Sequence, residues 1–168
     1  NYWSMTTDIV QFIGQREGGM SKLAGKKIGY VYHDSAFGKE AIPLLQDMAA
    51  RYQFGLELIP VAPPGLDQQS QWLQVRQVKP DYVILWSAGV MTPSALSSAA
   101  KIGYPRDHIV GITWAGSEED TTGPGMAAKG YIAANYSGNG RDFPVIGEIM
   151  KRVYDKNKGN LADASRVG

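Results

Sequence analysis

Short apolar runs alternate along the chain with stretches in which apolar residues recur every three or four positions. The first pattern is typical of buried strands, and the second of helices that bury one face. Five apolar runs, rich in β-branched and aromatic residues, predict strands over residues 28–32, 56–61, 82–86, 108–114 and 130–136. The stretches between and around them predict helices.

Residues that favour helix starts mark several of these helices. Thr6 and Thr7 are expected to cap the first one, and Asp67 to cap the third. Pro43 is expected to distort the first turns of the second helix, which runs on from Ser35, because proline lacks a backbone N–H. Pro93 suits the first turn of the fourth. The most amphipathic helix comes last, with a stripe of Ile146, Ile149, Met150, Val153 and Tyr154.

Strands that are separated by helices of about ten residues imply right-handed crossovers and a parallel sheet. The series therefore predicts an α/β fold, a flavodoxin-like doubly wound and mainly parallel sheet. Ligands of such sheets bind at the carboxyl ends of the strands, close to the point where the strand order reverses. The loops that leave the predicted strands there are 33–38, 87–92, 115–120 and 137–142.

Length and composition narrow the class of protein. The 168 residues fit a single globular domain, and the 17 basic and 16 acidic residues nearly balance. No basic run with interleaved aromatics is present, so neither nucleic acid nor an anionic membrane surface is an expected partner. No apolar stretch approaches the roughly 20 residues that span a bilayer. The absence of cysteine excludes disulfides and thiol chemistry and is compatible with an oxidising compartment.

The sequence offers little equipment for catalysis. It has no G-x-S-x-G motif and only two histidines, His33 and His108, the second of which is expected at the surface. His33 beside Asp34 is either half of an acid–base pair or a solvated loop residue. The histidines are distant and paired-carboxylate spacing is absent, so no metal and no cofactor are expected. The glycine-rich segment 123–128 precedes a strand instead of following one, which excludes a phosphate-binding loop.

Two other features are candidates for ligand contact. The acidic run 118–120 either holds a cation or a ligand amine, or favours the start of a helix through the helix dipole. Phe37 follows the first predicted strand, and Trp86 and Trp114 end the third and fourth. Such aromatics either wall a cleft or cap the core from the side. For Trp86 we favour the core, and for Phe37 and Trp114 both interpretations stand.

Three segments carry a family resemblance. Residues 26–39 resemble a strand followed by D-x-x-[YF]-G, residues 79–85 resemble a K-P-D-hydrophobic strand, and residues 100–104 resemble the helix end after it. In order and spacing, and over essentially the whole chain, the sequence resembles the type 1 periplasmic solute-binding proteins of branched-chain amino acid ABC transporters. The resemblance implies one lobe of a two-lobed protein, with three crossover strands and a ligand in the cleft between the lobes.

This chain resembles the second lobe, over residues 1–168. Residues 1–5 are expected to be the crossover from a first lobe outside the chain, and residues 158–168 a tail towards the second crossover. The first lobe, which usually grips the ligand's carboxylate in this family, would then be a partner of this one.

The resemblance also implies site residues, to which Trp114 is added as a strand-end aromatic. The candidate ligand-binding residues are Ser35, Ala36, Phe37, Ser87, Ala88, Gly89, Val90, Trp114, Gly116, Ser117 and Glu118. Glu118 matches the position where amino-acid binders place a glutamate against the ligand ammonium, and a one-residue slip would give that role to Glu119. The small 87–89 loop departs from the aromatic version of the family, which leaves room for a bulkier or aromatic ligand.

The function that the resemblance implies is binding of a small organic solute, an amino acid or an aromatic or other carboxylate compound, by hinge closure. The solute would be delivered to an ABC permease in the membrane, and the protein would be periplasmic or extracellular in a bacterium. No enzymatic activity is expected. Two alternatives remain: a ligand-sensing receptor or regulator domain of the same architecture, and a small α/β enzyme that uses His33 and Asp34.

Overall fold

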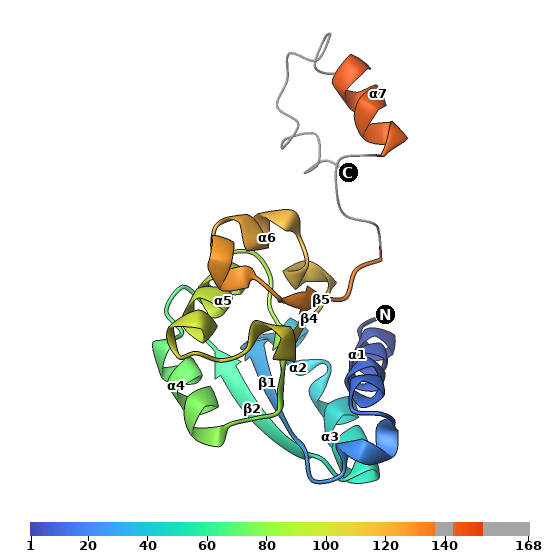
Figure 1. Cartoon of the computed structure of the whole chain (residues 1–168), viewed down its shortest axis with the longest axis vertical. Coiled ribbons are helices and arrows are strands. Elements are labelled where there is room, and N and C mark those ends of the chain that lie inside the picture. Colours follow the sequence, from blue (N-terminus) through green and yellow to red (C-terminus); the bar gives the residue numbers. More distant parts are fainter. Residues whose placement is uncertain (137–142, 153–168) are drawn as a thin grey trace. The chain divides into compact units, whose positions relative to one another are not determined.

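The structure is a computed structural model that describes residues 1–136 and 143–152 (Figure 1). The chain divides into two compact units, Asn1–Tyr136 and Ser137–Gly168. In the second unit the described residues include the helix α7 (Pro144–Arg152). Four parts of the sequence predictions lie outside the described residues: the loop 137–142, Val153, Tyr154 and the tail 158–168.

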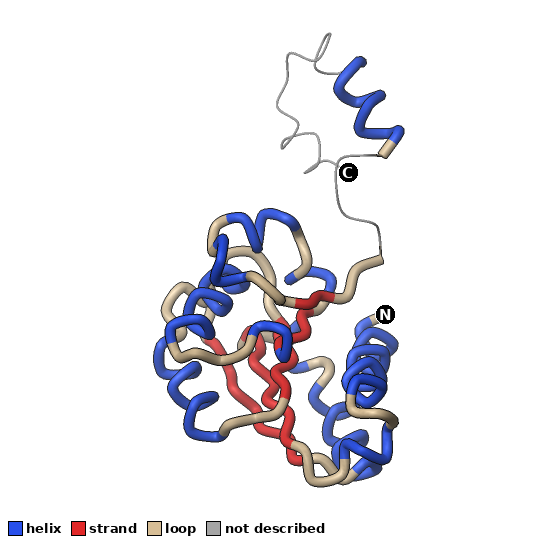
Figure 2. Tube along the Cα trace, viewed as in Figure 1, coloured by secondary structure: helices blue, strands red, loops and turns tan. Residues whose placement is uncertain are grey.

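Five parallel strands form one sheet in the first unit (Figure 2). They are β1 (Lys27–His33), β2 (Gly55–Val61), β3 (Tyr82–Trp86), β4 (Ile109–Gly111) and β5 (Ile132–Ala133). Their order is β2-β1-β3-β4-β5, so the direction of winding reverses between β1 and β3. This order is the flavodoxin-like one, and the predicted fold class is confirmed.

Helices cover both faces of the sheet (Figure 1). The α-helices of the first unit are α1 (Tyr2–Arg16), α2 (Ala36–Lys39), α3 (Ile42–Tyr52), α4 (Gln69–Val78), α5 (Met91–Lys101) and α6 (Glu118–Thr122). Short 3₁₀ segments are η1 (Met20–Leu23), η2 (Arg106–His108), η3 (Thr113–Ala115) and η4 (Gly125–Ala128). Among the described residues, no helix is both long and apolar enough to cross a bilayer.

The central strands are buried on both faces because each face packs against helices. Tyr30 and Ile84 are paired in register and join the core under α1 and α3, whereas their neighbours Val31 and Leu85 join the core under α4 and α5. All four side chains are fully buried. This two-sided burial explains why β1 and β3 read as continuous apolar runs in the sequence.

The first helix begins earlier than predicted. Asn1 caps α1, accepting a 2.9 Å hydrogen bond from the Ser4 N–H on its side-chain oxygen. The prediction that Thr6 or Thr7 caps this helix is wrong, because both hydroxyls instead donate to carbonyls one turn back inside it, at 2.8 and 3.0 Å. Residues 2–5 are therefore helical.

The second predicted helix is two helices. Its start after Ser35 is the single turn of α2, and Pro43 lies in the first turn of the separate helix α3, where its missing N–H costs nothing. Pro93 occupies the first turn of α5 as predicted. Gln68 is the N-cap of α4, one residue after the predicted cap Asp67, whose Oδ1 accepts from the Gln69 N–H at 3.1 Å.

The last two strands are shorter than predicted. His108 belongs to η2, and Trp114 to η3, so β4 is three residues long and Trp114 does not end a strand. β5 then pairs with β4 over two residues, Ile132 and Ala133. Ile112 and Ala115 are buried in the core from the turn after β4, and periodicity over so few residues does not distinguish such burial from that of a strand.

Candidate functional site

Three of the predicted loops lie at one edge of the sheet. Loops 33–38 and 87–92 follow β1 and β3, and segment 113–120, which is the predicted loop 115–120 preceded by the turn of η3, follows β4. The three strands are parallel neighbours, so these loops lie side by side. We call this set of loops the carboxyl edge. It includes the reversal between β1 and β3, where ligands of doubly wound sheets bind.

Phe37 is held in a cluster of aromatic rings at this edge. Its ring lies 5.5 Å from that of Tyr2, 6.0 Å from that of Trp86 and 6.2 Å from that of His33, measured between centroids. The Trp86 indole N–H also donates to the Phe37 carbonyl at 3.1 Å. Trp86 is fully buried, in keeping with the core role favoured for it, whereas Phe37 is half-buried and keeps part of its ring exposed.

Trp114 extends the aromatic surface from β1 across to β4. Its indole N–H donates to the Tyr2 hydroxyl at 2.8 Å, and its side chain is 57% exposed. We call the connected side chains of Phe37, Tyr2 and Trp114 the aromatic line. Tyr2 was missed by sequence reasoning, although it lies three and seven residues before Met5 and Ile9, a spacing that continues the helical period of α1 back to the edge.

A buried contact between two hydroxyl groups holds the loop after β3. Ser87 is fully buried, and its hydroxyl lies 2.8 Å from that of Thr92, which ties the two ends of the loop together. Ala88, Gly89 and Val90 are exposed between them. Gly89 has a φ of +56°, a backbone conformation that favours glycine. The loop therefore presents small side chains and one isopropyl group to the edge.

The loop before α6 offers a carboxylate. Gly116 allows a close approach to β5, since a Cβ there would lie 3.0 Å from the Ala133 Cβ. Ser117 is the N-cap of α6 and accepts from the Asp120 N–H at 3.3 Å. Glu118 and Ser117 are exposed, and the Glu118 side chain is free of ion pairs with described residues. The carboxylate of Glu118 is thus available to a ligand cation.

Asp120 is a buried carboxyl that sequence reasoning did not single out. It is 7% exposed, and its Oδ2 has no hydrogen-bond partner in the described structure. Burial raises the pKa of this carboxyl above its ordinary value, and hydrogen bonds with Ser117 offset the rise only in part. The spacing Ser117-x-x-Asp120 is that of a capping box, the signal that would have turned this side chain inward.

The Asp120→Asn substitution is expected to stabilise the protein at pH 7 by about 1 kcal/mol, because the amide keeps the shape but carries no charge to desolvate. Because the pKa of Asp120 is raised in the folded state, its ionised carboxylate destabilises the protein at pH values above that pKa. This destabilisation declines as the pH falls, so the stability that Asp120→Asn gains should vanish below the ordinary pKa of 3.8. Urea unfolding across pH measures it, with exposed Asp8→Asn as control. A loss of stability in Asp120→Asn would contradict this.

The two histidines have structural contacts. His33 Nδ1 lies 2.8 Å from the Ser35 hydroxyl, whereas the adjacent Asp34 forms an ion pair with Lys39 at 2.6 Å. The two side chains thus have different partners. His108, expected at the surface, is only partly exposed there, because its ring stacks on Tyr82 with 4.8 Å between centroids. Across residues 1–136 and 143–152, no group of three or more His, Cys, Asp or Glu residues could hold a metal.

Exposed apolar side chains follow the carboxyl ends of the other strands as well. Leu66 follows β2, Val90 follows β3 and Tyr136 follows β5, and each is at least half exposed. Gln68 connects two of these loops by donating to the carbonyls of Gly65 and Met91, at 2.6 and 2.8 Å. Together with Trp114, these side chains expose apolar surface along one edge, which is typical of a binding surface.

The fold and this edge define a class: an α/β lobe that can hold a small molecule at the carboxyl ends of a doubly wound sheet. A family model described as periplasmic binding protein matches residues 1–166. The chain belongs to this periplasmic binding protein family, as the resemblance in its sequence predicted. The periplasmic character of the family confirms the predicted localisation.

Several solved structures are similar to this chain. The chain is 42% identical, with a TM-score of 0.86, to an ABC transporter permease from the Pseudomonas fluorescens group, covering 98% of this chain and 40% of that one. It is 17% identical, with a TM-score of 0.79, to a branched-chain amino acid ABC transporter from Thermus thermophilus with bound valine, covering 98% and 42%.

A third similar structure is a solute-binding protein of an ABC transporter from R. palustris in complex with benzoate, 19% identical with a TM-score of 0.66, covering 97% of this chain and 45% of that one. The chain thus spans less than half the length of each of the three structures. No curated protein matches the chain.

Proposed function

We propose that this chain is the second lobe of a two-lobed solute-binding protein that serves an ABC transporter. A small organic solute would bind between the carboxyl edge and a first lobe, the lobes would close about their hinge, and the closed form would be presented to a membrane permease. The observation that carries the proposal is the aromatic line, which joins the edges of β1 and β4 and leaves the Trp114 indole largely exposed.

The geometry favours binding over catalysis. His33 and Asp34 contact different partners, so the acid–base pair that an enzyme would need is not formed. The edge instead combines exposed aromatic and aliphatic surface with one free carboxylate, that of Glu118. Apolar walls with a few polar groups are typical of sites that hold a ligand without transforming it. We therefore assign no reaction to this lobe.

We infer that the solute is an amino acid or an aromatic or other carboxylate compound. The family structures that hold valine and benzoate support this class. The exposed loop after β3 carries small side chains at Ala88 and Gly89, which suits a bulky or aromatic body better than an aromatic loop would. Isothermal titration calorimetry of the two-lobed protein with the natural amino acids and with benzoate tests the proposal. One-to-one binding of a compound in this set supports it, and the absence of binding throughout the set contradicts it.

Substitution of Glu118 separates the two kinds of solute. If the ligand carries an ammonium group, Glu118→Gln is expected to weaken its binding about tenfold, because a charge-assisted hydrogen bond is lost. Binding of an aromatic acid without an amino group should not weaken. Calorimetry of both solutes measures the difference, with Glu119→Gln as the neighbouring control. An equal loss for both solutes, or a larger loss in the control, would contradict this role for Glu118.

A further inference from the structure

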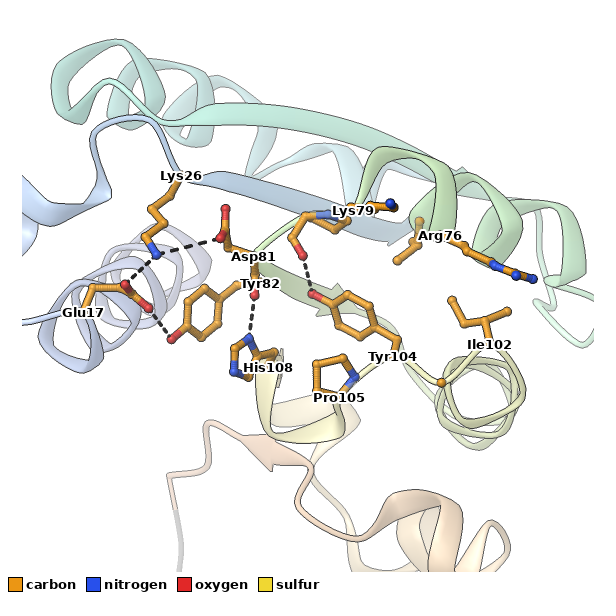
Figure 3. Close-up of a pocket in the computed structure, with 13 residues that line it drawn as sticks. Glu17, Lys26, Arg76, Lys79, Asp81, Tyr82, Ile102, Tyr104, Pro105 and His108 are labelled. Atoms are coloured by element: carbon orange, nitrogen blue, oxygen red, sulfur yellow. Dashed lines mark hydrogen bonds and ion pairs between the residues drawn. The ribbon is translucent and has the colours of Figure 1, made fainter.

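The opposite edge of the sheet carries a cavity of about 360 Å³ (Figure 3). It lies where the strands begin: Lys26 precedes β1, Asp81 precedes β3 and His108 precedes β4. We call it the amino-edge pocket. It takes no part in the proposed solute site, because strands of five to seven residues separate the two edges by about 20 Å.

One end of the amino-edge pocket is a closed network of charges. The Glu17 carboxylate accepts from Lys26 Nζ at 2.8 Å and from the Tyr82 hydroxyl at 2.8 Å, and Lys26 lies 3.8 Å from Asp81. The Lys26 ammonium holds the pKa of Glu17 below its ordinary value, and Glu17 raises the pKa of Lys26. His108 closes the network, with Nδ1 2.7 Å from the Asp81 carbonyl. Both acids are thus already paired with Lys26.

The middle of the pocket is apolar. Its wall is made of Val75, Pro80, Ile102, Tyr104 and Pro105. The Tyr104 hydroxyl donates to the Pro80 carbonyl at 3.0 Å, which satisfies its polar end and leaves the ring as wall. This part of the pocket can hold a hydrocarbon or aromatic body.

The rest of the pocket lining carries two cations without acidic partners among the described residues. Arg76 and Lys79 come from the last turn of α4 and its C-cap, and neither side chain has an ion pair or hydrogen bond with a described residue. Figure 3 shows Arg76 at the end of the pocket away from Glu17 and Lys26, and Lys79 between that end and Asp81. An exposed guanidinium and an exposed ammonium on the lining of an apolar pocket match a ligand with an anionic head and an apolar body.

We propose that the amino-edge pocket binds a small organic anion, a carboxylate on a compact aromatic or aliphatic body, at a second site of this lobe. The carboxylate pairs with Arg76 and Lys79, and the body packs against Tyr104 and Pro105. The volume is within the range of small-molecule sites. Cationic ligands do not fit, because Glu17 and Asp81 are already paired with Lys26.

The test is a titration of the 168-residue chain with sodium 4-phenylbutyrate, followed by backbone amide NMR shifts. Saturable shifts are expected at Lys79, Gly103 and His108. The double variant Arg76→Gln/Lys79→Gln should weaken binding about tenfold or more, since it removes both charge-assisted contacts. The double variant Lys22→Gln/Lys129→Gln removes the same charge from elsewhere on the exposed surface and should bind as the wild type does.

The uncharged analogue 4-phenylbutanol tests whether binding requires the carboxylate. It is expected to bind the wild type about tenfold more weakly than the acid does, and to be indifferent to the double substitution at Arg76 and Lys79. Shifts confined to Phe37 and Trp114, equal binding of acid and alcohol, or unchanged affinity in that variant would each overturn the proposal. The Arg76→Gln/Lys79→Gln variant should leave the solute affinity of the two-lobed protein unchanged. A failure of the solute-binding proposal can therefore be told apart from a failure of this one.

Discussion

In the two-lobed protein, the Phe37→Ala substitution is expected to weaken solute binding between tenfold and a hundredfold. The exposed part of the Phe37 ring lies at the carboxyl edge, in contact with Tyr2 and Trp86, and would lose its contact with the body of the solute. Removing an aromatic ring from a buried contact costs about 1.5 to 3 kcal/mol, which corresponds to this range of affinity. Calorimetry with the solute that binds tightest measures the change.

A loss of packing inside the lobe must be separated from a loss of ligand contact. Phe37→Leu keeps most of the buried volume against Trp86 but removes the ring, so it is expected to preserve stability better than alanine does while still weakening binding. Thermal unfolding of both variants without ligand measures how much stability each one loses through packing inside the lobe. If Phe37→Leu bound the solute as tightly as the wild type, the ring would have only a structural role.

The Gly38→Ala substitution is expected to destabilise the lobe by about 3 kcal/mol, or roughly 6 to 12 °C in Tm. A Cβ at Gly38 would collide with the backbone carbonyl of His33 and press on the Tyr32 ring. Backbone cannot yield as a flexible side chain does, so α2 would have to move away from the end of β1. The Tyr30 hydroxyl, which donates to the Gly38 carbonyl at 2.8 Å, would lose that geometry.

Gly123→Ala is the matched control for this clash. A Cβ at Gly123 meets no atom within 4 Å, and its φ of −60° suits any residue. Its Tm should stay within about 2 °C of the wild type, the range for a surface substitution. Differential scanning calorimetry of the two variants checks both values. Equal stability of Gly38→Ala and the wild type would show that the approach of α2 to β1 is not as close as described.

The central sheet could be predicted from the sequence because β1 and β3 are buried on both faces. Their apolar runs are short and rich in β-branched and aromatic residues, which favours strands, and the helices between them require a parallel arrangement. The end of β4 could not be predicted in this way. Trp114 lies in a 3₁₀ turn, and its position next to Tyr2 depends on a helix 112 residues earlier in the chain.

The side-chain contacts of the candidate site could not be predicted from the sequence. Adjacency of His33 and Asp34 in the sequence left an acid–base pair open beside the favoured interpretation, a solvated loop histidine. The separate contacts of these residues with Ser35 and Lys39 become visible only in three dimensions. The burial of Asp120 beside exposed Glu118 follows from the capping geometry of α6, which a run of three acids does not reveal by composition. Loop positions at the strand ends were predictable, whereas the direction of each side chain was not.

The most direct test of the account is a crystal structure of the two-lobed protein with the solute that binds tightest in the calorimetric set. We expect the solute at the carboxyl edge, with its body within about 4 Å of the Phe37 ring and the Trp114 indole and the lobes closed around it. A solute bound elsewhere, with no contact to loops 33–38, 87–92 or 113–120, would contradict the central claim.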